Sequence, residues 1–258
     1  SEMSDTQASP LTKDFKIDLP EDVSFIINTI EKNGHQAYAV GGCVRDTIMG
    51  VTPNDWDITT NALPEEVKSY FTKTIDTGIQ HGTVTVMLHS TGYEVTTYRI
   101  DGDYLDGRHP SSVEFSDRLT DDLCRRDFTI NAMAYNERTG LVDEYGGIDD
   151  INNKVIRCVG RPEERFTEDA LRMMRAIRFS AQLGFTIEDN TYKAIEKLSA
   201  NIQKVSMERV CVELKKTLMS DNPDFCRLYG TTNLFKDILP QLHDSFTKRQ
   251  SKRILLTC

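Results

Sequence analysis

The hydrophobic pattern of this 258-residue chain changes at Arg161-Pro162, and this change constrains the fold more than any other feature. Before it, short apolar or alternating stretches are separated by turn residues, which is typical of strands. After it, apolar residues recur at helical intervals over residues 166–183, 187–198 and 206–219, with no strand-like alternation between them. The sequence therefore predicts an α+β chain, with a small mixed, mostly antiparallel sheet first and an α-helical part second.

The same change sets the predicted domain boundaries. Residues 1–15 are polar and are expected to form a disordered tail, residues 16–160 a head domain, and residues 161–258 a helical domain. Within the head, the pattern predicts helices over residues 20–33 and 44–49, strands over 37–40 and 56–59, and paired strands over 82–88 and 93–100 joined at Ser90-Thr91-Gly92.

Composition excludes several classes of protein. No apolar run approaches the length that spans a membrane, and no secretory signal is recognisable. The six cysteines and five histidines show neither CxxC pairs nor zinc-ligand spacing, so a cytoplasmic protein with reduced thiols is expected. The net charge of −9 argues against sequence-blind coating of nucleic acid but leaves a local basic groove open.

A glycine turn and a pair of aspartates form the first chemical motif. Gly41 and Gly42 would let backbone N–H groups approach phosphate oxygens, and Arg45 supplies a nearby cation. Asp55 and Asp57 are two residues apart, so the alternation of side chains along a strand would place both carboxylates on one face. Paired carboxylates suit the two Mg²⁺ ions of nucleotidyl transfer. Taken alone, each half of the motif is also compatible with a solvated turn or strand end.

A stripe of charged residues forms the second motif. Asp169, Arg172, Arg175 and Arg178 recur every third residue and are predicted to lie along one side of a helix. The arginines would repel one another unless an anion, such as a triphosphate or RNA phosphate, compensates. The opposite side is apolar and would pack against the core: Leu171, Met174, Ile177 and Ala181. The alternative is an exposed basic face neutralised by nearby carboxylates, those of Glu163, Glu164 and Glu168.

These motifs belong to a longer ordered series: GGCVRDTIMGVTPNDWDITT, LTDDLCRRDFTINAMAYN, DEYGGIDDI and RFTEDALRMMRAIRF, followed more loosely by the segment around Glu208–Leu218. On this series, which covers Ala37–Met219, the chain resembles the class II tRNA CCA-adding enzymes and bacterial poly(A) polymerases of the polymerase-β-like nucleotidyltransferase superfamily. The resemblance implies a nucleotidyltransferase head followed by an α-helical neck and a partial body.

The resemblance also implies roles for residues of the head. Asp55 and Asp57 are expected to be catalytic and to hold two Mg²⁺ ions. The triphosphate is expected to lie against Gly42, with Gly41 at lower weight, and against Arg45. Glu94 stands where the family carries a further acidic residue near the metals, although a surface carboxylate is an equal alternative.

The resemblance implies that two further segments bind the nucleotide. Arg126 resembles the family's nucleotide-binding arginine, with Asp127 and Asn131 as supporting groups one helical turn apart. Asp169 and Arg172 are expected to read the base edge and to accept C or A, as such side chains do on base edges generally. The remaining arginines of the stripe, Arg175 and Arg178, are expected to complete the pocket.

The implied activity is addition of CCA to the 3′ end of tRNA from CTP and ATP, with no membrane or protein partner. Residues 101–112 correspond to a loop that relatives need for switching to ATP, and its length favours CCA over CC addition. An A-adding enzyme or poly(A) polymerase and a non-catalytic RNA- or nucleotide-binding remnant stay open as alternatives. Because relatives usually continue well past this length, CTP binding with weak RNA binding is expected.

Overall fold

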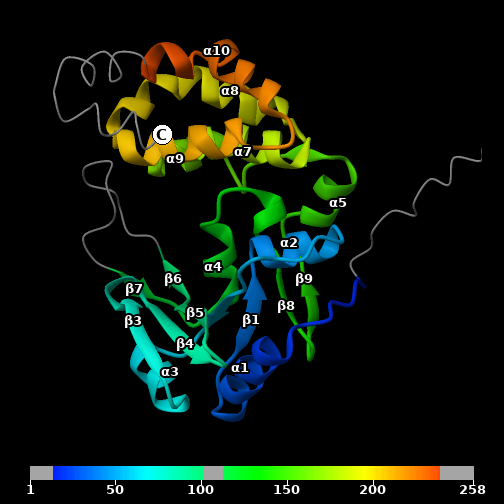
Figure 1. Cartoon of the computed structure of the whole chain (residues 1–258), viewed down its shortest axis with the longest axis vertical. Helices are drawn as coiled ribbons and strands as arrows, with labels where there is room; N and C mark the ends of the chain where they lie inside the picture. Colours follow the sequence, from blue (N-terminus) through cyan, green and yellow to red (C-terminus); the bar gives the residue numbers. More distant parts are fainter. Residues whose placement is uncertain (1–13, 101–112, 239–258) are drawn as a thin grey trace, which may run out of the picture.

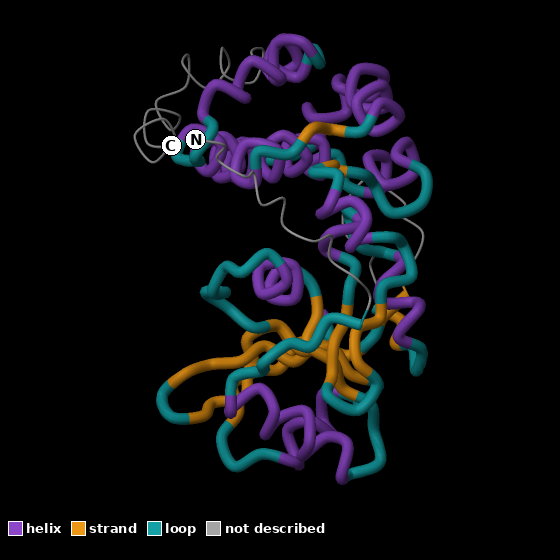
Figure 2. Tube along the Cα trace, turned by 90° about the vertical axis from the view of Figure 1, so that its right-hand side faces the viewer, coloured by secondary structure: helices purple, strands orange, loops and turns teal. Residues whose placement is uncertain are grey.

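The computed structural model describes residues 14–100 and 113–238. Figure 1 shows the labelled strands with helices α1–α4 in one half of the molecule and helices α7–α10 in the other, and Figure 2 shows the same two parts from the side. The expected α+β architecture, with a mostly antiparallel sheet followed by helices, is confirmed. The loop predicted at residues 101–112 lies outside the described residues.

One seven-stranded sheet, in the order β3-β4-β5-β2-β1-β8-β9, organises the first part. Every neighbouring pair in this sheet is antiparallel except β2 and β5, which run parallel. Its strands are β1 (Ala37–Val40), β2 (Asp57–Thr60), β3 (Thr74–Gly78), β4 (Thr83–Leu88), β5 (Thr91–Thr97), β8 (Ala134–Asn136) and β9 (Gly140–Val142). The predicted strands over residues 37–40 and 56–59 are confirmed to within one residue.

The two faces of the sheet are covered by different helices. In β1, the two alanines join the main apolar core with α1 (Glu21–Lys32), whereas Tyr38 and Val40 join a smaller cluster with Leu123 of α4 (Leu119–Cys124). Helix α3 (Pro64–Tyr70) lies on the α1 side, at the lower end of the molecule in Figure 1. The alternation of β1 therefore defines an α1 face and an α4 face of the sheet.

Helix α1 confirms the periodicity argument directly. Its apolar residues Val23, Ile26, Ile27 and Ile30 are all buried, and the helix ends where the amide of Gly34 bonds to the carbonyl of Glu31. The short helix α2 (Gly42–Ile48) follows the glycine turn as expected, although it begins at the second glycine rather than at residue 44.

The observed hairpin turn, at His89-Ser90, overlaps the predicted turn only at Ser90. His89 and Ser90 adopt positive φ, whereas Thr91 and Gly92 already pair with Leu88 and Met87 in the ladder of β4 and β5. The prediction placed the turn at the glycine, because glycine usually supplies positive φ. Strand β5 also ends early, and β6 (Arg99–Ile100) leaves the sheet to pair with β7 (Glu114–Phe115).

The second part consists mainly of helices. These are α6 (Pro162–Glu168), α7 (Leu171–Leu183), α8 (Asp189–Leu198), α9 (Met207–Leu218) and α10 (Arg227–Thr231), with α5 (Gly147–Asn152) before them. Two details correct the prediction. Asp169 is extended, with φ −146° and ψ 106°, and separates α6 from α7. In addition, β10 (Val155–Ile156) and β11 (Thr186–Ile187) form a parallel pair too short to leave an alternating pattern.

Within the described residues, no helix is long and apolar enough to cross a membrane. Cys43, Cys158 and Cys226 are free thiols.

Candidate functional site

Carboxylates gather at the end of β2. Asp57 is the first residue of this strand and pairs in register with Val40 of β1 and with Glu94 of β5. Residues opposite one another in a sheet point to the same face, so Asp57 and Glu94 share the α4 face with Val40. Asp55 lies before the strand begins, so strand alternation does not place it, contrary to the prediction. Asp55, Asp57 and Glu94 are called the carboxylate edge below.

The electrostatics of Asp57 show which groups surround it. Desolvation raises the pKa of this carboxyl, the negative charges of Glu94 and Asp55 raise it further, and the positive charge of Arg126 opposes them. Three carboxylates and one arginine are therefore close enough to interact. Among the described residues, no group of three or more His, Cys, Asp or Glu side chains is arranged so that it could hold a metal ion by itself.

The glycine turn makes room for two arginines. Gly41 has φ +85° and ψ −137°, a backbone conformation open mainly to glycine, and a Cβ added there would lie 3.1 Å from Nη1 of Arg126. A Cβ on Gly42 would lie 3.4 Å from Nη2 of Arg45. The turn therefore permits a close approach of guanidinium groups.

This close approach predicts a stability difference between two glycines. Gly41→Ala is expected to destabilise the fold by about 1–3 kcal/mol through backbone strain, with additional crowding of Arg126. Gly34→Ala is the matched control, because Gly34 has φ +87° but open space where the Cβ would stand. Its cost should be limited to strain, about 1 kcal/mol. Urea unfolding measures both, and equal losses would contradict the combined effect of greater backbone strain at Gly41 and crowding of Arg126.

Arg45 is enclosed by other side chains. It is buried, its Nε and Nη2 donate to Oδ1 of Asp46 at 3.1 and 2.9 Å, and its Nη1 donates to Oδ1 of Asn131. Asn131 in turn donates to Oδ1 of Asp127 at 3.3 Å. These bonds form a continuous polar chain from α2 towards α7, because Arg175 of α7 donates to the other oxygen of Asp127.

The predicted helical turn between Asp127 and Asn131 is wrong, although the two side chains are in contact. Helix α4 ends at Cys124, and Asn131 is the last residue of a short 3₁₀ turn, Thr129–Asn131. Burial alone would raise the pKa of Asp127, but the positive charge of Arg175 and then its two hydrogen bonds, at 2.9 and 2.6 Å, outweigh burial and lower the pKa. Asp127 is therefore an ionised, buried anchor for α7.

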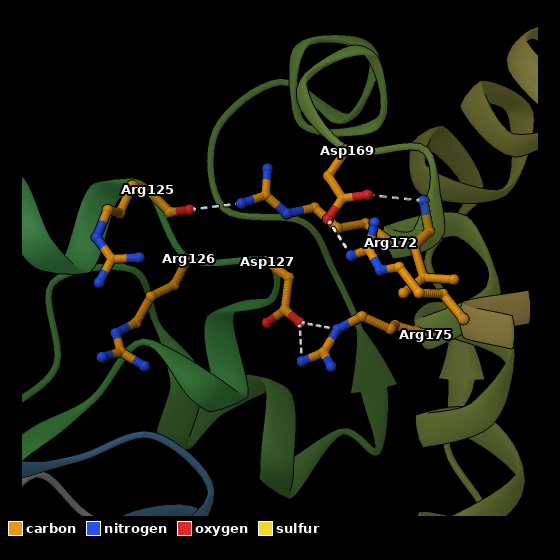
Figure 3. A pocket seen from close by; sticks show the side chains of 8 residues that line it. Arg125, Arg126, Asp127, Asp169, Arg172 and Arg175 are labelled. Carbon is orange, nitrogen blue, oxygen red and sulfur yellow. Dashed lines mark hydrogen bonds and ion pairs between the residues drawn. The ribbon is translucent and has the colours of Figure 1, made fainter. Parts of the chain in front are cut away.

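A cavity of about 250 Å³ opens beside this anchor (Figure 3). Five of the lining residues are arginines and two are aspartates, so guanidinium groups dominate the wall. The lining consists of Arg125, Arg126, Asp127, Asp169, Leu171, Arg172, Arg175 and Arg209. Arg126 lines this cavity and also acts on Asp57, so the arginine pocket adjoins the carboxylate edge.

The residues expected to read a base lie together in this pocket. Asp169 accepts from the amide of Leu171, the first residue of α7, at 3.1 Å and from Nη2 of Arg209 at 3.1 Å. Arg172 donates to Glu168 at 2.7 Å and to the backbone carbonyl of Arg125 at 2.9 Å. Figure 3 shows both side chains at the same wall of the pocket.

The arginine stripe is neutralised by the protein itself, which corrects the expectation that a bound anion must compensate it. Its three pairs are Arg172 with Glu168, Arg175 with Asp127, and Arg178 with Glu213. The alternative identified Glu168 correctly, whereas Glu163 pairs with Lys197 and Glu164 with Arg161. These partners come from other elements, which helical periodicity does not reveal.

Arg178 does not line the pocket. It is buried against Glu213 of α9 and against the ring of Phe179, so the structure assigns it to packing between α7 and α9. Conversely, the sequence argument gave no role to Arg209, which lies in the pocket, although it lies in the loosely matching fifth segment.

Known proteins match this chain in sequence and in fold. Sequence profiles of the families "Poly A polymerase head domain" and "Probable RNA and SrmB- binding site of polymerase A" match residues 37–157 and 184–246. The CCA-adding enzyme of Leuconostoc mesenteroides is 54% identical over 198 residues, which cover 77% of this chain and 49% of the relative.

Two solved structures of CCA-adding enzymes also match this chain. The crystal structure of the Bacillus stearothermophilus CCA-adding enzyme in complex with CTP has a TM-score of 0.76 at 43% identity, covering 81% of this chain and 51% of that one. The Thermotoga maritima CCA-adding enzyme complexed with tRNA_CCA has a TM-score of 0.69 at 27% identity, covering 84% and 52%. The chain thus spans about half the length of the relatives that it matches.

A mostly antiparallel sheet with carboxylates at one strand end, next to an arginine pocket closed by a helix, defines a nucleotidyltransferase head with a helical neck. Together with the sequence and structural matches, these features show that the chain belongs to the family of CCA-adding enzymes and bacterial poly(A) polymerases.

Proposed function

We propose that the chain carries the catalytic and nucleotide-selecting part of a tRNA nucleotidyltransferase that adds CCA from CTP and ATP. The observation that carries this proposal is the adjacency of the arginine pocket to the carboxylate edge, with Arg126 common to both. A nucleoside triphosphate bound there would place its charge among the arginines and its α-phosphorus towards Asp57. The relative crystallised with CTP supports this choice of ligand.

The carboxylate edge fits a divalent cation. Asp55 and Asp57, with Glu94 nearby, would supply oxygen ligands of the kind that Mg²⁺ prefers. Burial, and then the negative charges of Glu94 and Asp55, raise the pKa of Asp57, and a bound cation would oppose both effects. One or two carboxylates plus substrate phosphates are the usual Mg²⁺ ligand set, so the lack of a complete protein cage is compatible with binding. We assign Asp55 and Asp57 to two Mg²⁺ ions, which would activate the RNA 3′-hydroxyl and neutralise the departing pyrophosphate.

In the proposed reaction, the RNA 3′-hydroxyl attacks the α-phosphorus, a phosphodiester bond forms, and the bond to pyrophosphate breaks. The protein contributes position and charge. Asp169 would accept from the exocyclic amino group of cytosine or adenine, and Arg172 would donate to the ring acceptors. Guanine and uracil present a carbonyl oxygen to Asp169 instead, which would exclude them.

The family that matches residues 37–157 is named for poly(A) polymerase, so the product must be measured. Transfer RNA that lacks its terminal nucleotides is incubated with CTP, ATP or both, and the products are sized and sequenced. CCA addition is expected with both nucleotides and CC addition with CTP alone. A-only or poly(A) products would replace the proposal with the runner-up activity, and binding without incorporation would identify a non-catalytic nucleotide-binding protein.

A further inference from the structure

Asp122 is a fully buried carboxylate that the proposed reaction leaves without a role. It lies on α4 with no solvent exposure. Its Oδ1 accepts a hydrogen bond from Nη2 of Arg125 at 3.0 Å, and its Oδ2 accepts from Nη2 and Nε of Arg126 at 3.1 and 3.3 Å. One carboxylate, sealed from water, thus holds two consecutive arginines that both line the pocket.

The carboxyl group of Asp122 must be ionised to bind both Arg125 and Arg126. Burial alone would raise the pKa of Asp122, but the charges and hydrogen bonds of Arg126 and Arg125 outweigh it and lower the pKa. A buried carboxylate is tolerated when it is paired and its oxygens accept hydrogen bonds. The two bonded arginines supply this pairing, and they stand between the carboxylate and the pocket.

The bonds to Asp122 also set the direction of Arg126. They use its Nε and Nη2, which leaves Nη1 on the opposite side, 3.1 Å from where a Cβ on Gly41 would stand. The charge of Arg126 acts on Asp57 from this position. In Figure 3, the guanidinium groups of Arg125 and Arg126 lie on one side of the pocket, apart from those of Arg172 and Arg175.

We propose that Asp122 is a positioning residue that fixes Arg125 and Arg126 as a preformed cradle for the triphosphate of the incoming nucleotide. The pocket brings five arginines together, and their mutual repulsion would disperse the two flexible side chains of this cradle if no buried anion held them. With Asp122 in place, the ordering is complete before the nucleotide arrives. This inference rests on the proposed function, because it takes the ligand to be a nucleoside triphosphate.

Asp122→Asn tests the proposal, with Asp121→Asn as the matched control. Asp121 is the preceding residue of the same helix, but its carboxylate bonds to Ser116 and to neither pocket arginine. Calorimetry with the whole chain measures the affinities for CTP and for CMP. Because hydrogen bonds to charged groups contribute about 1.5–3 kcal/mol, Asp122→Asn should weaken CTP binding by about 10- to 100-fold, and the ratio of CTP to CMP affinity should fall about tenfold or more.

The outcomes separate positioning from general structural support. Unchanged CTP affinity, or equal weakening of CTP and CMP, would overturn the role of Asp122, as would a loss of the same size in Asp121→Asn. If Asp122→Asn does not fold, Asp122→Glu keeps the buried charge but displaces the carboxylate, and the same selective loss for CTP is expected. Failure of the wild-type chain to bind CTP would instead refute the proposed function itself.

Discussion

An Asp57→Asn chain is expected to add nucleotides to RNA about 10³-fold or more slowly than the wild-type chain, because loss of a metal-binding carboxylate removes several kcal/mol of transition-state stabilisation. The amide has the same shape but no charge, and Asp57 is the residue on which the interactions with Glu94, Asp55 and Arg126 converge. Single-turnover incorporation of CTP into tRNA lacking its terminal nucleotides measures the rate.

The Asp57→Asn chain should lose catalytic rate but keep most of its affinity for CTP. The arginine pocket does not include Asp57, so CTP affinity should change far less than the rate of incorporation. Asp76→Asn provides the control, because Asp76 lies exposed on β3 of the same sheet and pairs with Lys68 instead. A rate for Asp57→Asn within tenfold of wild type, or an equal loss in Asp76→Asn, would place the catalytic carboxylates elsewhere.

The sequence was sufficient to predict a helix or strand wherever the local order of apolar and polar residues determines it. The apolar spacing of α1 and the continuous apolar strand β1 were predicted nearly residue by residue, since burial of one face is recorded in the order of side chains. The motif series also indicated Asp57, Arg126 and Asp169 as parts of one site. Arg126 and Asp169 line the arginine pocket, and the charge of Arg126 also acts on Asp57. Their functional roles stay predictions.

Contacts between residues far apart in the sequence could not be predicted. No spacing rule connects Arg178 with Glu213, or Arg209 with Asp169, because each pair joins different helices through tertiary packing. The stripe of arginines therefore had the spacing of a ligand site, yet each arginine already has a carboxylate partner in the fold. The extended conformation of Asp169 was missed for a similar reason, since helical periodicity continues across the break between α6 and α7.

The domain boundary predicted between residues 160 and 161 also stays a prediction. The parallel pair of β10 and β11 joins residues on either side of it. Near this pair, Arg157 bonds to Asp150 and lies 3.6 Å from Glu188, the residue that caps α8. These contacts connect the helical part to the sheet-bearing part, so the arginines of α7 are held in place relative to the carboxylate edge.

The pair of Arg178 and Glu213 should dominate the stability of the helical part. Both side chains are buried, and Nε of Arg178 is in direct contact with Oε2 of Glu213. Burial lowers the pKa of Arg178, and the charge of Glu213 opposes this effect. In Glu213→Gln the guanidinium would keep its burial and lose its counter-charge, so the free energy of unfolding should fall by about 3–5 kcal/mol.

Glu163→Gln removes the same charge from an exposed pair with Lys197 and should cost less than about 1 kcal/mol. Replacing both buried partners, as in Arg178→Met/Glu213→Leu, should recover much of the loss, because no unpaired charge then stays in the core. Urea unfolding monitored by circular dichroism measures all three variants. A loss in Glu213→Gln no larger than that in Glu163→Gln would mean that apolar packing, and not this ion pair, holds α7 against α9 and keeps Arg172 and Arg175 at the pocket.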